Sequence, residues 1–123
     1  MQLLSDILSY CVIPPYCNQV ELHPYLPQTA LVEFCIRNSI KVVAFSPFGG
    51  MSYVELGVPK ELGGGLLNES LISTIGKKYN KTTAQVLLHW NIQRGVGVIP
   101  KSSGSHLVEN SQIFDFTLTS EEV

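Results

Sequence analysis

Apolar residues recur along the chain at two different periods, which predict helices and short strands in alternation. Helical spacing predicts four helices, over residues 2–11, from about 31 to 38, over 71–79 and over 82–92. Segments rich in β-branched residues predict strands over residues 16–22, 40–45 and 96–99. A further amphipathic segment follows residue 102. This order predicts parallel strands joined by crossover helices.

Residues 47–68 form a connection much longer than the usual handful of residues, and they contain six glycines and two prolines. Loops of this length tend to be functional lids. The triplet at 63–65 lacks the order GxxxxGK[ST] and does not open a helix after a strand, so it is not interpreted as a phosphate cradle. The glycine triplet is therefore interpreted as a flexible hinge or a plain linker.

The third predicted strand runs into Pro100, Lys101 and Ser102, and a second polar pair follows at Glu109 and Asn110. This order brings an ammonium group, a hydroxyl group and free backbone N–H groups to the end of a strand and the start of a helix, where anions bind. A phosphate or pyrophosphate is the expected guest. The alternative is a surface turn with one solvated lysine.

Composition excludes several classes of function. The 123 residues are 45% hydrophobic, which is enough for one domain with a core. The net charge is −2 and the basic residues are scattered, so the chain lacks the basic patch that binding to nucleic acid requires. Three cysteines without a CxxC pair or metal-like spacing indicate reduced, buried thiols and no metal site. The N-terminus lacks a basic region and no apolar run approaches about 18 residues, so we expect a cytoplasmic protein without a membrane span.

Polar side chains follow or line the predicted strand ends, which share one rim in a parallel sheet or barrel. They include Gln19, Glu21 and His23 on the first strand, Ser46 after the second and Lys101 after the third. Glu21 and His23 could form a general acid/base pair, but a hydrogen-bonded structural role is favoured.

Two predictions concern the C-terminal half. His89 and Trp90 lie on the flank of a predicted helix and are interpreted as surface and packing residues. Thr119 and Glu122 have the spacing of a capping box, which predicts that a helix begins there.

Several motifs, in this order, resemble those of the aldo-keto reductase family and together cover nearly the whole chain. They are NQVELHPY at 18–25, AFSPFG at 44–49, TTAQVLL at 82–88, IPKS at 99–102, EN at 109–110 and FDF at 114–116. The resemblance implies an α/β fold, a partial (β/α)8 TIM barrel made of about the last three strands with their helices. Residues 1–123 would then be the C-terminal part of an NADP-dependent oxidoreductase domain.

The resemblance also implies how a nicotinamide cofactor would lie. Gln19 would bind the carboxamide, and Phe45, where the family usually has Tyr, would stack under the ring, although plain core packing is the alternative. Ser46, with Phe48 and Gly49, would line the pyrophosphate, and the long loop at 47–68 would close over the cofactor.

At the adenosine end, the resemblance assigns Lys101 and Ser102 to the 2′-phosphate of NADP and Glu109 and Asn110 to the adenine, with a solvated helix face as the alternative for Glu109. The family usually has an Arg where this chain has His106, and the connecting loop here is one residue shorter. Histidine is mostly neutral at pH 7 and cannot form a bidentate fork, so we expect weaker discrimination against NAD.

In the family, the nicotinamide transfers a hydride to a small carbonyl substrate and a Tyr, assisted by Lys, Asp and His, donates the proton; none of these four residues has a counterpart here. We therefore expect no catalytic residue in this chain and no activity of the chain alone. Three hypotheses follow: a truncated aldehyde or ketone reductase, a non-catalytic protein with a partial nucleotide site that assembles with another chain, or a remnant without function. Exposed sheet edges would make the free monomer marginally stable or aggregation-prone.

Overall fold

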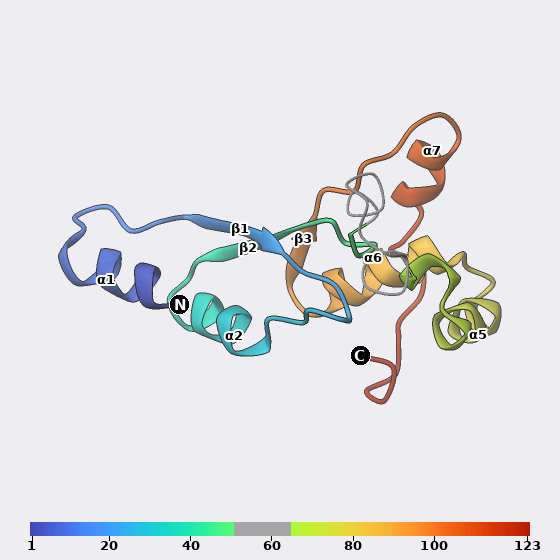
Figure 1. The fold of residues 1–123 in the computed structure, drawn as a ribbon, viewed down its shortest axis with the longest axis horizontal. Helices are drawn as coiled ribbons and strands as arrows, with labels where there is room; N and C mark the ends of the chain where they lie inside the picture. Colours follow the sequence, from blue (N-terminus) through green and yellow to red (C-terminus); the bar gives the residue numbers. More distant parts are fainter. Residues whose placement is uncertain (51–64) are drawn as a thin grey trace.

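The structure, a computed structural model, describes residues 1–50 and 65–123 and has the predicted alternation of helices and strands (Figure 1). Its elements in chain order are α1 (Gln2–Tyr10), β1 (Cys17–Glu21), α2 (Thr29–Arg37), β2 (Lys41–Phe45), the 3-10 helix η1 (Leu66–Asn68), α5 (Ser70–Tyr79), α6 (Thr83–Gln93), β3 (Val96–Val98) and α7 (His106–Ser111). The helices and strands predicted from hydrophobic periodicity and β-branched segments are present, with ends shifted by a few residues. Most of the loop predicted at 47–68 falls on residues 51–64, outside the described part.

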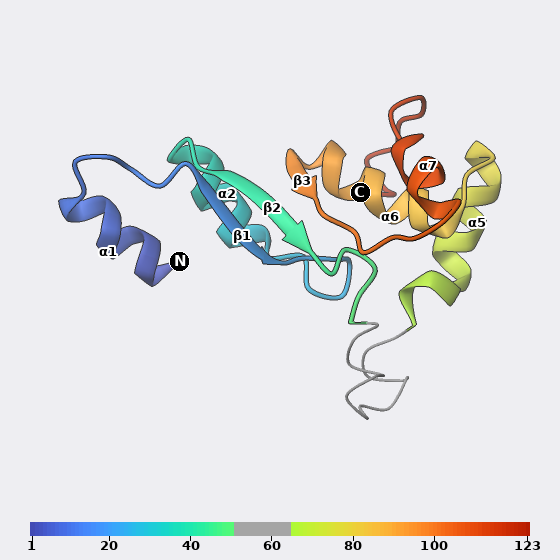
Figure 2. The ribbon, with the colours of Figure 1, turned by 90° about the horizontal axis from the view of Figure 1, so that it is seen from above.

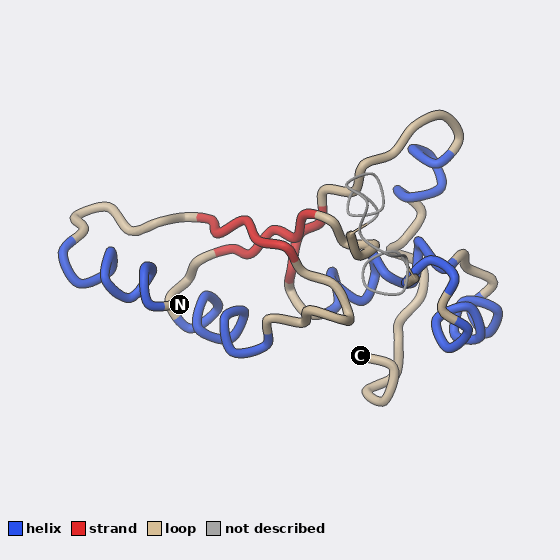
Figure 3. The backbone as a smooth tube through the Cα atoms, viewed as in Figure 1, coloured by secondary structure: helices blue, strands red, loops and turns tan. Residues whose placement is uncertain are grey.

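The three strands form one parallel sheet in the order β1-β2-β3, as predicted (Figure 3). In the register, Glu21 is the partner of Phe45, and Ala44 is the partner of Val98. The carboxyl ends of the strands are therefore level, and the segments that follow them begin side by side. This confirms an α/β fold with a three-stranded part of a barrel.

One face of the sheet is buried and the other is open. Val42 and Ala44 on β2 and Val96 on β3 are almost fully buried in the core, and α2 and α6 contact the sheet on that side (Figure 2). Because side chains alternate along a strand, Phe45 points to the opposite face, where 39% of it is exposed. Gln19, two residues before Glu21, shares that open face.

The segment after α7 packs against α5 and α6. Lys81 Nζ donates to Asp115 Oδ2 at 2.8 Å, a hydrogen bond that lowers the pKa of the Asp115 carboxyl group. Trp90 Nε1 donates to the carbonyl of Val123 at 2.7 Å. His89 and Trp90 are only 7% and 8% exposed, so the prediction that His89 is a surface residue was wrong: this segment covers it.

The helix predicted to begin at Thr119 is absent, and residues 120–122 form a turn instead. Half of the expected capping box is present, since Glu122 Oε2 accepts a hydrogen bond from the Thr119 N–H at 2.9 Å. Glu122 also accepts from Lys78 Nζ at 2.9 Å and from the Tyr79 hydroxyl at 2.7 Å. The Thr119 backbone N–H and these two donors lower the pKa of Glu122 to about 2. The motif therefore anchors the segment to α5.

Candidate functional site

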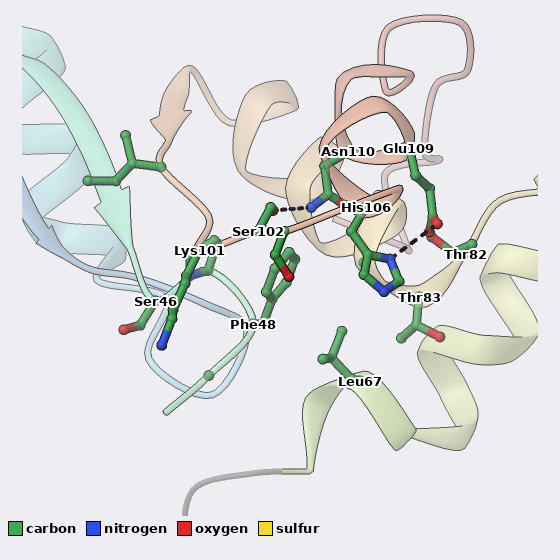
Figure 4. Close-up of a pocket in the computed structure, with 15 residues that line it drawn as sticks. Ser46, Phe48, Leu67, Thr82, Thr83, Lys101, Ser102, His106, Glu109 and Asn110 are labelled. Atoms are coloured by element: carbon green, nitrogen blue, oxygen red, sulfur yellow. Dashed lines mark hydrogen bonds and ion pairs between the residues drawn. The ribbon is translucent and has the colours of Figure 1, made fainter. Parts of the chain in front are cut away.

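A pocket of about 710 Å³ lies where the segments after β2 and β3 meet the starts of α6 and α7 (Figure 4). It is lined by Ser46, Pro47, Phe48, Gly49, Leu67, Thr82, Thr83, Ala84, Ile99, Lys101, Ser102, Ser103, His106, Glu109 and Asn110. The set includes eight of the ten residues predicted to bind a cofactor, all except Gln19 and Phe45. The structure thus brings together residues that are more than 60 positions apart in the sequence.

A tight turn after β2 forms one wall of the pocket. Ser46 has a left-handed backbone with φ 48°, and the Gly49 N–H donates to its carbonyl at 2.9 Å. Gly49 has φ +72°, and a Cβ there would lie 3.0 Å from Leu66 Cδ1. The positive φ and the close approach of Leu66 therefore favour glycine at this position.

The segment after β3 supplies charge and hydroxyl groups. The Ile99 N–H donates to the Ala44 carbonyl at 3.1 Å, which keeps this segment beside β2. Among the described residues that line the pocket, Lys101 carries the only permanent positive charge. In the view of Figure 4, the Lys101 and Ser46 side chains lie on one side and those of His106 and Glu109 on the other.

Asn110 presents an unsatisfied polar atom at the pocket. Its Nδ2 donates to Ser102 Oγ at 2.6 Å, while its Oδ1 is buried without a hydrogen-bond partner among the described residues. An unpaired buried acceptor is costly, so a ligand N–H at this position would be stabilising. With the Lys101 ammonium group in the same pocket, the residues present fit a ligand that carries both a phosphate and a nitrogen base.

The helix start that was predicted beside Lys101 contributes less to anion binding than expected. α7 begins four residues after Ser102 and has fewer than two turns, so its dipole is weak. Its first residue, His106, contacts Glu109 through Nδ1 and Oε2 at 3.5 Å. Glu109 is partly exposed in this pair at the pocket wall.

Sequence reasoning missed Thr82, Thr83 and Ala84, which bring the start of α6 to the pocket. Thr82 caps this helix: its hydroxyl accepts from the Gln85 N–H at 3.3 Å, and Gln85 Oε1 accepts from the Thr82 N–H at 3.0 Å. Its eleven residues make α6 the stronger dipole at the site. The sequence predicted this helix start at residue 82 but not its place at the pocket, which depends on tertiary packing.

Gln19, Phe45 and the pair of Glu21 and His23 lie outside the pocket lining. Gln19 and Phe45 are on the open face of the sheet, with Phe45 directly before Ser46. His23 is 8% exposed, and its Nε2 lies 3.3 Å from Glu21 Oε1. This is the hydrogen bond expected for a structural role at the rim.

The sequence model of the Aldo/keto reductase family matches residues 2–123. The chain belongs to the aldo/keto reductase family. It is 50% identical over 113 residues to the mouse (Mus musculus) protein "Aldo-keto reductase family 1 member D1", a match that covers 89% of this chain and 33% of the mouse protein. It is 44% identical over 124 residues to the "Probable NAD(P)H-dependent D-xylose reductase xyl1" of Emericella nidulans, covering 99% of this chain and 39% of the fungal protein.

Solved structures of the family agree with this assignment. The aldo-keto reductase AKR2E5 of the silkworm, Bombyx mori, in its complex with NADPH superposes with a TM-score of 0.87 at 39% identity, over 99% of this chain and 37% of the silkworm protein. The chain therefore spans between one third and two fifths of the length of these relatives, and the three-stranded sheet corresponds to part of their barrel.

Within residues 1–50 and 65–123, no helix is long and apolar enough to span a membrane. No group of three or more His, Cys, Asp or Glu side chains in these ranges could hold a metal ion.

Proposed function

We propose that this aldo/keto reductase chain supplies the part of an NADP-dependent carbonyl reductase that holds the cofactor, and that the chain alone is inactive. The pocket is the observation that carries the proposal, because it gathers a lysine, hydroxyl groups, an unpaired amide oxygen and two helix starts. Lys101 and Ser102 would bind the 2′-phosphate, His106 would contribute from the start of α7, and Glu109 and Asn110 would contact the adenine.

The nicotinamide end of the cofactor would lie on the open face of the sheet. Ser46, Phe48 and Gly49 at the β2 turn would contact the pyrophosphate, since this turn joins the pocket to Phe45. The exposed ring of Phe45 offers a stacking surface without a hydroxyl group, and Gln19 on the same face offers an amide for the carboxamide. The bound cofactor would supply the hydride that reduces a small aldehyde or ketone.

Inactivity of the isolated chain follows from the resemblance to the family. None of the catalytic Tyr, Lys, Asp and His residues has a counterpart among the 123 residues. Without a positioned acid, the alkoxide that develops at the carbonyl oxygen receives no proton. Turnover would require the preceding part of a barrel.

The test is titration of the chain with NADP⁺ at a concentration where light scattering shows the chain to be monomeric. We expect binding, and we expect Lys101→Met to weaken it by about tenfold, because the substitution removes the positive charge and keeps most of the side-chain length. Lys41→Met is the matched control, since Lys41 is an exposed lysine at the opposite, amino end of the sheet. Absence of binding by the unmodified chain, or equal effects of the two variants, would overturn the proposal.

A further inference from the structure

Three polar side chains on α6, Gln85, His89 and Gln93, are spaced four residues apart and therefore share one face of the helix. Each makes a hydrogen bond to the backbone of residues 109–118. Gln85 and His89 are 5% and 7% exposed, an unusual burial for polar residues on a helix. This polar row attaches the segment that contains α7 to the rest of the molecule.

Gln85 connects two walls of the pocket. Its Oε1 accepts from the Thr82 N–H at 3.0 Å, at the start of α6. Its Nε2 donates to the Glu109 carbonyl at 2.9 Å and to the Gln112 carbonyl at 3.3 Å, at the end of α7. Both N–H groups of the amide and its oxygen are used, so the orientation of the side chain is fixed.

The other two members of the row hold the chain beyond α7. His89 Nδ1 lies 2.6 Å from the Ile113 carbonyl, to which it donates. Gln93 Nε2 donates to the Leu118 carbonyl at 2.8 Å, and Gln93 Oε1 accepts from the Leu118 N–H at 2.9 Å. These bonds set the path of the segment but do not touch the pocket.

α7 itself has no buried residue, so apolar packing does not fix its position. We propose that Gln85 is a positioning residue: by holding the Glu109 and Gln112 carbonyls, it sets the distance between α7 and the start of α6, and thereby the shape of the cofactor pocket. The expected effect of Gln85 on the binding of NADP⁺ rests on the proposed function. His89 and Gln93 support the same segment from farther along the helix.

Gln85→Glu tests this role selectively. The introduced carboxylate keeps an oxygen for the Thr82 N–H, so the helix cap is retained, but it places a second oxygen against two carbonyl oxygens. We expect NADP⁺ to bind about tenfold more weakly at pH 8. Because a protonated carboxyl group regains a donor, we expect the difference from the unmodified chain to shrink as the pH falls to about 5.

Val86→Ala is the control, because it truncates a core side chain on the same helix without removing these hydrogen bonds. We expect it to lower thermal stability and to leave the affinity for NADP⁺ and its pH profile unchanged at temperatures where the chain is folded. Amide hydrogen exchange gives a second readout: Gln85→Glu should speed exchange in α7 relative to both other proteins.

The outcomes separate the two proposals. Failure of the unmodified chain to bind NADP⁺ at any pH overturns the proposed function, while exchange in α7 still decides the role of Gln85. Binding by the unmodified chain together with unchanged affinity and unchanged α7 exchange in Gln85→Glu overturns the positioning role alone.

Discussion

At the scale of single residues, His106 sets the cofactor preference that we expect of this chain. It stands where the resemblance to the family implies an Arg, and it lies 3.5 Å from Glu109, whose carboxylate would repel a phosphate. Histidine cannot form the bidentate fork of a guanidinium group. We therefore expect NADP⁺ to be preferred over NAD⁺ only weakly, and His106→Arg to increase the preference by about tenfold, measured as the ratio of the two Kd values.

His106→Gln is the comparison variant, because it removes the imidazole without adding a permanent charge. It should leave the ratio close to that of the unmodified chain. A strong preference for NADP⁺ in the unmodified chain, equal to that of His106→Arg, would contradict this account and would mean that Lys101 alone discriminates between the cofactors.

The sequence predicted Lys101, Ser102 and Asn110 as neighbours because they are close in the chain and follow a strand. It did not reveal the contribution of Thr83 or the role of Gln85, because both depend on how α6 lies against α7. That packing is set by contacts between segments 24 to 27 positions apart. Local motifs therefore predicted the charged part of the pocket, and tertiary packing determined the rest.

At the scale of elements, hydrophobic periodicity predicted the positions of the helices and strands well. The predictions that failed concern places where one segment of the chain covers another. The spacing of Thr119 and Glu122 predicts a helix, but residues 120–122 form a turn, and the Glu122 carboxylate accepts hydrogen bonds from Lys78 and Tyr79 on α5. His89 was assigned to the surface because no helical pattern shows that residues after α7 will fold over α6. Its hydrogen bond to Ile113 spans 24 positions.

The close contact between the end of α5 and the following loop gives a testable prediction. Gly76 lies inside α5, where Ala normally favours a helix by about 1 kcal/mol. Here a Cβ would lie 2.5 Å from the Lys81 carbonyl oxygen, whereas the Lys81 N–H already donates to the Gly76 carbonyl at 2.8 Å. We expect Gly76→Ala to destabilise the fold by about 2 kcal/mol, measured by chemical denaturation.

Lys77→Ala, the adjacent exposed position on α5, tests the helix propensity alone and should be neutral or slightly stabilising. If Gly76→Ala were also stabilising, the backbone of the loop at Lys81 would have to move freely. The ion pair of Lys81 with Asp115 would then contribute little to the position of that loop.

At the scale of the whole molecule, the sheet has an open face and two unpaired edges. β1 and β3 are the outer strands of the described sheet, and Phe45 is exposed on the face away from the core. Unpaired strand edges and exposed apolar side chains favour association. We expect the isolated 123-residue chain to unfold with low cooperativity or to aggregate at micromolar concentration, as measured by calorimetry and light scattering. A cooperative transition of a monomer would contradict this expectation.

The unpaired edges of the sheet indicate that further strands of a barrel would complete the fold. The chain corresponds to between one third and two fifths of its relatives, and its level strand ends leave both edges available to continue a parallel barrel. Mixing the chain with the preceding barrel segment of a relative should therefore raise the cooperativity of unfolding and produce NADPH-dependent reduction of an aldehyde. In the same mixture, Lys101→Met should lower the apparent affinity for NADPH, whereas Lys41→Met should leave it unchanged. Recovery of cooperativity without turnover would support a non-catalytic assembly, because the edges would be paired while the reacting groups stayed out of reach.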